Sequence, residues 1–68
     1  MKTFTVYGTK DKDKPADHVV FQNMIYSQAA LARSEATARM HGYKRLEYHE
    51  NPCFENGYKG GKALVVNL

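Results

Sequence analysis

Alternating apolar and polar residues predict a β-hairpin in the first third of the chain. Apolar residues occupy every second position of Thr3–Thr9, a period of two that is typical of a half-buried strand. A charged turn follows, and the β-branched and aromatic run His18–Met24 predicts the returning strand. The residues expected to meet on the core face of this hairpin are Phe4, Val6, Val19 and Phe21.

An alanine-rich run, Gln28–His41, predicts a single helix. Ser27 precedes it as a good N-cap, and Gly42 follows it at the position where a left-handed residue ends many helices. At 100° per residue, we expect an alanine-lined stripe to face the sheet, which allows a close approach. This stripe holds Ala29, Ala32, Ala36 and Met40, with Leu31 and Ala38 on the opposite side.

Two further strands are predicted after the helix, at Tyr43–His49 and Lys62–Leu68. The connection between them, residues 51–61, contains the strong turn dipeptide Asn56-Gly57 and leaves open a short extra strand at Cys53–Glu55. The apolar residues of these strands that we expect to face inward are Leu46, Tyr48, Leu64, Val66 and Leu68.

The order of the elements predicts an α+β fold of the ββαββ type in a single domain, residues 1–68. Short connections and one helical crossing favour a four-stranded antiparallel sheet in the order 2-1-3-4, with the helix on one face. A chain of 68 residues has no room for a second domain or for the walls of a substrate cleft.

One helix covers one face of a sheet, so the sequence predicts that the other face is open. That face is either an ordinary solvated surface with scattered tyrosines or a recognition patch, because interface hot spots favour tyrosine and arginine. By the predicted registers it carries Thr3, Thr5, Tyr7, His18, Val20, Gln22, Tyr43, Arg45, Glu47, His49, Ala63, Val65 and Asn67.

The net charge of +3 favours an acidic partner or a nucleic acid, although the excess is small. The lysines of residues 10–14 alternate with aspartates, which predicts a solvated turn. The glycine-rich basic segment 58–62 is either a plain solvated turn or a loop that holds phosphates or carboxylates together with Lys44 and Arg45. The predicted partner-binding residues are Tyr7, Tyr43, Lys44, Arg45, Tyr58, Lys59 and Lys62.

No spacing of residues in the chain indicates a catalytic or metal-binding site. The three histidines fall on different predicted elements, and no Ser-His-Asp, Cys-His or metal-ligand pattern appears, so we expect no catalytic residue, metal or cofactor. Cys53 is the one cysteine and cannot close an intramolecular disulfide, which favours a reducing compartment. With no signal-peptide pattern and no long apolar stretch, we expect a cytoplasmic protein without a membrane partner.

In length and element order, the chain resembles small phage-encoded inhibitors of bacterial host machinery, especially type I anti-CRISPR proteins and the small phage inhibitors of RNA polymerase. The resemblance rests on the hairpin at Thr3–Met24, the Ser-capped helix at Ser27–His41 and the strands at Tyr43–Glu50 and Lys62–Leu68. It implies a non-enzymatic binding protein that occupies a functional surface of a bacterial protein or ribonucleoprotein complex. Many such inhibitors are acidic mimics of nucleic acid, whereas this chain is basic, so mimicry is not expected here.

Two other functions fit the same sequence. A small nucleic-acid-binding domain would stack Tyr7 and Tyr43 on bases while Lys44, Arg45 and Lys62 neutralise phosphates. A homodimer that pairs the open faces would make the protein a structural accessory.

Overall fold

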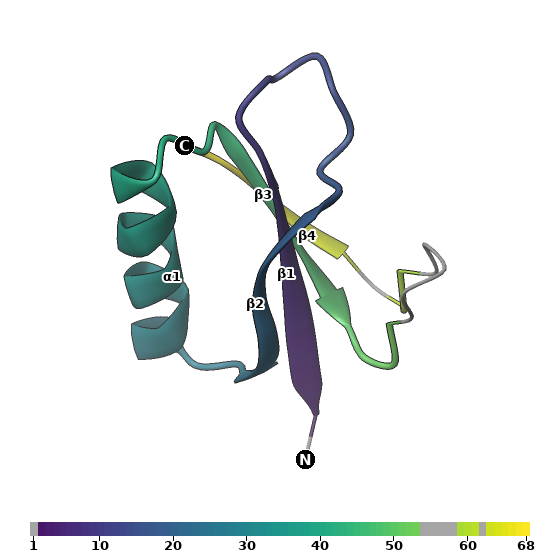
Figure 1. Cartoon of the computed structure of the whole chain (residues 1–68). Coiled ribbons are helices and arrows are strands. Elements are labelled where there is room, and N and C mark those ends of the chain that lie inside the picture. The colour runs from purple at the N-terminus through teal and green to yellow at the C-terminus, as the bar shows by residue number, and fades with distance from the viewer. Residues whose placement is uncertain (1, 54–58, 62) are drawn as a thin grey trace.

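The computed structural model describes residues 2–53, 59–61 and 63–68. These residues form four strands and one helix in the predicted order, and the strands pair antiparallel as β2-β1-β3-β4 (Figure 1). The elements are β1 (Thr3–Thr9), β2 (His18–Ile25), α1 (Gln28–Met40), β3 (Arg45–Glu50) and β4 (Ala63–Asn67). The α+β, ββαββ prediction with sheet order 2-1-3-4 is therefore confirmed.

Strand and helix ends differ from the prediction by at most two residues. The third strand shows the largest change, because it begins at Arg45 rather than at Tyr43. The predicted turn Asn56-Gly57 and most of the alternative strand Cys53–Glu55 lie outside the described residues.

Both predicted caps of α1 are present. The Ser27 Oγ accepts a hydrogen bond from the Ala30 N–H at 3.0 Å, and Gly42 adopts a left-handed φ of 85°. At the C-terminus, the N–H groups of Gly42 and Tyr43 donate to the carbonyls of Arg39 and Ala38, which is the pattern of a Schellman motif. This turn fixes the position of Tyr43 immediately after the helix.

The predicted buried stripe of the helix is wrong. The sheet-facing side instead contains Leu31, Ser34 and Ala38, and of these Ser34 and Ala38 are fully buried. Met40 is 86% exposed, and the remaining residues of the predicted stripe, Ala29, Ala32 and Ala36, are also exposed. The helix buries a serine rather than an alanine stripe because that serine has a hydrogen-bond partner in the sheet.

The partner is Tyr48, which lies at the centre of the core. Ser34 Oγ donates to the Leu31 carbonyl at 2.8 Å, so its contact of 2.6 Å with the Tyr48 hydroxyl must be donated by Tyr48. Tyr48, Leu46 and Val6 are fully buried, which confirms the inward face of β3. A polar pair therefore links α1 to the sheet inside an otherwise apolar core, and both hydroxyl groups are satisfied.

Two register shifts in β2 explain why its alternation could not be extrapolated. Phe21 lies opposite Val6 as predicted, but the pairing shifts on both sides of this position, and Asn23 has a positive φ of 55°. Each shift changes which side chain reaches the core. Val20 consequently packs against the core, whereas it was expected on the other face, and Val19 is largely exposed.

The second face of the sheet is covered at β1 and β3, which contradicts the predicted open face. Tyr7 is only 7% exposed, and Thr5, Thr9 and His49 are similarly buried. The cover comes from the β1–β2 loop, whose Ala16 is fully buried, and from the described residues 51–53 and 59–61. There the Gly60 N–H contacts the Cys53 Sγ at 3.2 Å and the Gly61 N–H donates to the Glu50 carbonyl at 3.1 Å.

Burial has an electrostatic consequence for two tyrosines. Desolvation raises the pKa of Tyr48, with the hydrogen bond to Ser34 as a smaller opposing effect. Desolvation also raises the pKa of Tyr7, assisted by its hydrogen bond with the Cys53 thiol. The fold thus favours the neutral phenol at both positions.

We expect the protein to lose stability as pH rises above about 10. Because both folded pKa values lie above the ordinary value of 10.0, their contribution is fully present below pH 10 and disappears as pH rises through the folded values. Urea midpoints measured from pH 7 to 11 should fall at the alkaline end, and less steeply for Tyr48→Phe. An alkaline limb that is unchanged in Tyr48→Phe would show that Tyr48 contributes nothing to it.

Candidate functional site

The structure separates the two tyrosines that were expected to act together. Tyr7 lies beneath the cover of the second face, whereas Tyr43 lies on the helix side of the sheet and packs against the core. Tyr43 rests on Gly8, where a Cβ atom would approach Tyr43 Cδ1 and Val20 Cγ2 to 2.8 Å. The alternation of β3 does not extend to Tyr43 because the Schellman turn, and not the strand, sets its direction.

Arg45 holds the β1–β2 loop in place. Its Nη1 and Nη2 atoms donate to the carbonyls of Lys12 and Lys14 at 2.8 and 2.7 Å, and its Nε lies 3.6 Å from Glu47. This planar guanidinium thus spans two backbone acceptors and a carboxylate. Residues 10–15 are exposed, as expected for a solvated turn, and their backbone is also anchored to β3 by Arg45.

Lys59 is also engaged within the protein. Its Nζ donates to the Ala16 carbonyl at 2.6 Å, lies 4.9 Å from the centre of the Tyr7 ring, and sits 3.8 Å from Glu47. Two of the predicted binding cations, Arg45 and Lys59, therefore meet at Glu47 and fasten the cover of the second face. Lys44 is exposed, and the predicted residues Tyr58 and Lys62 lie outside the described residues.

A polar cluster forms where this cover meets the sheet. His49 Nε2 lies 3.1 Å from Glu47 Oε1, and the His49 ring contacts Tyr7 edge to face at 5.4 Å. Cys53 lies nearby, with its Sγ 4.0 Å from the His49 carbonyl. Because His49 is only 8% exposed, this cluster is positioned to hold the cover rather than to meet a substrate.

A shallow groove opens on the helix side, between the β1–β2 hairpin and the end of α1. It consists of two adjoining hollows of about 430 and 330 Å³ that share Lys10, His18 and Tyr43. Lys14 lines one hollow and His41 the other. We refer to these five residues as the Lys10–Tyr43 groove.

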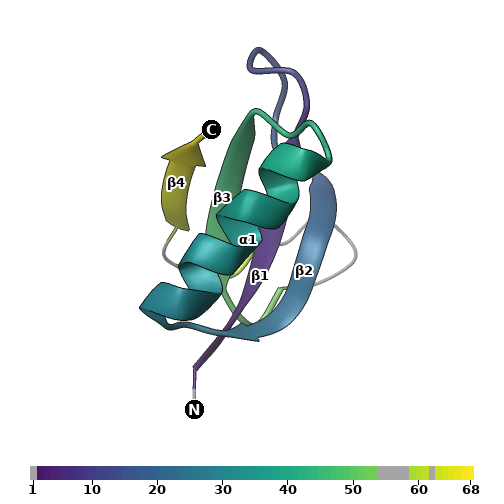
Figure 2. The same cartoon turned by 90° about the vertical axis from the view of Figure 1, so that its left-hand side faces the viewer.

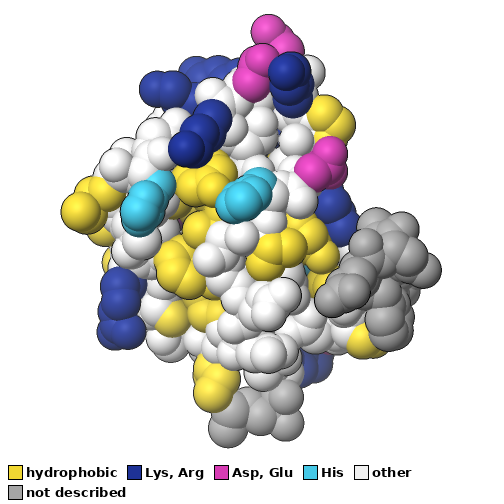
Figure 3. Space-filling view, in the orientation of Figure 1, with side chains coloured by type: hydrophobic (Ala, Val, Ile, Leu, Met, Phe, Trp, Pro, Cys, Tyr) yellow, Lys and Arg dark blue, Asp and Glu magenta, His cyan; other side chains and the backbone are white. Residues whose placement is uncertain are grey.

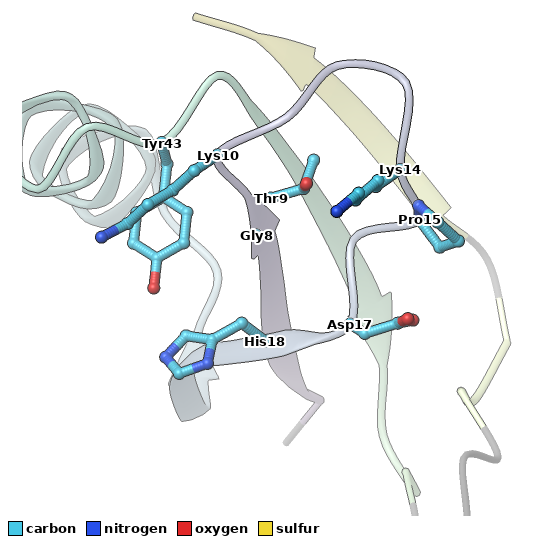
Figure 4. Close-up of a pocket in the computed structure, with 8 residues that line it drawn as sticks. All are labelled: Gly8, Thr9, Lys10, Lys14, Pro15, Asp17, His18 and Tyr43. Atoms are coloured by element: carbon cyan, nitrogen blue, oxygen red, sulfur yellow. The ribbon is translucent and has the colours of Figure 1, made fainter.

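Aromatic and cationic side chains lie next to one another in this groove. The rings of His18 and Tyr43 stack with their centres 5.9 Å apart and an interplanar angle of 24°. Lys10 Nζ lies 5.3 Å from the centre of the Tyr43 ring. Figure 4 shows Lys10, His18 and Tyr43 side by side, with the Asp17 carboxylate pointing away from them.

The surface view shows histidine, cationic and hydrophobic side chains close together. In Figure 3, histidine side chains lie below a group of lysine and arginine side chains, with hydrophobic surface exposed between them. The combination of a cation, a stacked aromatic pair and apolar surface suits an acidic or aromatic group of a binding partner.

Sequence reasoning found Tyr43 but missed the rest of this groove. Lys10 was expected in a solvated turn, and His18 and His41 were assigned to separate elements. They meet because the Schellman turn at Gly42 brings the end of α1 beside the start of β2. The Gly42-Tyr43 pair after a helix was the available signal for this turn.

Comparisons with known proteins found no family model, curated protein or solved structure that matches the chain. In the described part of the chain, no three histidine, cysteine, aspartate or glutamate side chains gather in a group that could hold a metal ion. Within the same described part, no helix has the length and apolar character needed to cross a membrane.

Proposed function

We propose that this protein is a small non-enzymatic inhibitor of phage or mobile-element origin that binds a functional surface of a bacterial effector complex in the host cytoplasm. The observation that carries the proposal is the Lys10–Tyr43 groove, which exposes cationic, imidazole and aromatic groups together. The class of target comes from the resemblance to anti-CRISPR proteins in chain length and predicted element order.

The groove is suited to inhibit a target by binding to it, without a chemical step. Tyr43 is backed by the Gly8 backbone and flanked by His18, so its ring is held before a partner arrives. A side chain that is already ordered loses less conformational entropy on binding. Inhibition of this kind needs only a stable contact, which the Lys10, His18 and Tyr43 side chains can provide.

Charge favours a protein surface as the partner over a continuous phosphate backbone. Residues 10–17 contain three lysines and three aspartates, so this loop carries no net charge. A nucleic acid would meet repulsion from the aspartates, whereas a protein surface can present both signs in matching positions. Glu47 lies beside both Arg45 and Lys59 and offsets one of their two positive charges.

The test uses a bacterial strain whose type I CRISPR complex eliminates a targeted plasmid. Expression of the wild-type chain should restore transformation to the level of a non-targeted plasmid. Lys10→Glu should weaken binding to the purified complex about tenfold or more, because it reverses the charge beside Tyr43. Lys2→Glu, at an exposed position near the other end of β1, is the matched control and should retain wild-type binding.

The proposal fails if the wild-type chain neither restores transformation nor binds the purified complex. It also fails in its structural part if Lys10→Glu and Lys2→Glu bind equally well. Circular dichroism of both variants shows whether a loss reflects binding or folding.

A second candidate function, nucleic-acid binding, is favoured by one observation. The stacked His18–Tyr43 pair with Lys10 above it resembles the way in which single-stranded binding proteins stack bases and neutralise phosphates. Gel-shift assays with single-stranded and double-stranded DNA and with RNA decide this point. Binding that weakens steeply with salt supports the candidate, and no binding at low salt removes it.

A further inference from the structure

The two edges of the sheet differ in how well they are protected. The β2 edge is interrupted by two register shifts and by the left-handed residue Asn23. In contrast, β4 pairs regularly with β3 along its whole length, Ala63–Asn67, and contains no proline and no charged residue. Edge strands of soluble proteins usually carry a bulge, a charge or a proline, so β4 lacks the common protection.

Hydrogen bonding shows which groups of β4 face outward. The Leu68 N–H donates to the Lys44 carbonyl at 2.9 Å, and the Asn51 N–H donates to the Thr3 carbonyl at 2.9 Å. Backbone groups along a strand of an antiparallel pair point alternately to the two sides. Since the Leu68 N–H points toward β3, the N–H and C=O groups of Leu64 and Val66 point toward β3 as well. The backbone groups of Ala63, Val65 and Asn67 therefore point away from the sheet.

The side chains of β4 other than Val66 are also exposed. Figure 2 shows α1 crossing the sheet with β4 lying beside it rather than beneath it. Leu64 is 42% and Val65 53% exposed, and these neighbours lie on opposite faces of the strand. On the helix side, Leu64 continues into an apolar hollow of about 360 Å³ lined also by Phe4 and Tyr26.

One register allows β4 to pair with a second copy of itself. When Val65 lies opposite Val65 of the second copy, Ala63 lies opposite Asn67, and all outward backbone groups find partners. The same register places Leu64 beside Val66 of the other copy on the helix side. Since residues 63–67 carry no charge, pairing brings no like charges together within the strand.

We propose that two copies of this chain associate edge to edge through β4, with a twofold axis at Val65, and form one continuous sheet. Both helices then lie on the same side, because the twofold axis runs perpendicular to the sheet. The Lys10–Tyr43 groove of each copy stays outside this contact, so the dimer is independent of the proposed function.

Sedimentation velocity of the full chain over a range of concentrations tests the association. The wild type should approach the mass of a dimer as concentration rises, whereas Val65→Lys and Val65→Glu should each remain monomeric. Mixing these two variants should restore the dimer, because the opposite charges meet on the twofold axis. A wild type that is monomeric throughout, or variants that dimerise alone, would overturn the proposal.

Amide hydrogen exchange of the wild type locates the contact without any substitution. In a monomer, the amides of Leu64 and Val66 are protected by β3 and those of Val65 and Asn67 exchange freely. At concentrations where the dimer forms, Val65 and Asn67 should become protected as well. A dimer in which these two amides still exchange freely would show that another surface makes the contact.

Discussion

Replacing Gly60 by alanine is expected to lower the free energy of unfolding by about 3 kcal/mol, at the upper end of the range for overpacking. A Cβ atom at this position would collide with the backbone carbonyl oxygens of Glu50 and Pro52. Backbone atoms cannot turn aside as the end of a flexible side chain can. The cover of the second face must then shift, which exposes Tyr7 and His49.

The adjacent glycine supplies the control for this experiment. A Cβ atom at Gly61 meets no atom of the described residues within 4 Å, so Gly61→Ala should keep the free energy of unfolding within about 1 kcal/mol of the wild type. Urea denaturation of the three proteins measures both effects. Equal stability of Gly60→Ala and Gly61→Ala would contradict the close packing of residues 59–61 on the end of β3.

Replacing Ser34 by alanine should destabilise the fold by about 1–3 kcal/mol, because the buried Tyr48 hydroxyl then has no acceptor. Tyr48→Phe should cost about 1 kcal/mol, since Ser34 can still donate to the Leu31 carbonyl. The double variant removes both polar groups and should be less destabilised than the sum of the two single changes.

Urea midpoints of the two single variants and the double variant complete the cycle. Strictly additive losses would mean that Ser34 and Tyr48 do not interact. The helix would then be docked by its apolar contacts alone, and the choice of the Leu31, Ser34 and Ala38 side would need another cause.

The elements and the sheet order were predictable because their signals are local. The period of two in β1 and the Ser27 and Gly42 caps depend on neighbouring residues alone, and β1 matches its predicted bounds. Once four strands and one helix are placed, short connections restrict the order of the sheet. Local signals were sufficient for the topology.

The face of each element was less predictable because it depends on distant partners. Hydrophobicity alone favoured the alanine stripe, and the Ser34 side became favourable only through Tyr48, which is fourteen positions away along the chain. In β2, the shifts beside Phe21 change the phase of the alternation. A pattern that records only whether each residue is apolar or polar contains neither effect.

The candidate site was mostly missed for the same reason. Arg45 and Lys59 were selected as free cations, yet each donates to carbonyls of the β1–β2 loop that are more than thirty positions away in the sequence. Conversely, Lys10 and His18 were assigned to a solvated turn and to the other face.

Hydrogen–deuterium exchange of the protein bound to a purified type I CRISPR complex tests the central claim, that the Lys10–Tyr43 groove is the binding surface. Binding should slow exchange in the segments that form the groove, at residues 8–10, 18–20 and 41–43. Protection confined to the cover of the second face, around Ala16 and Lys59, or no protection at all, would contradict it.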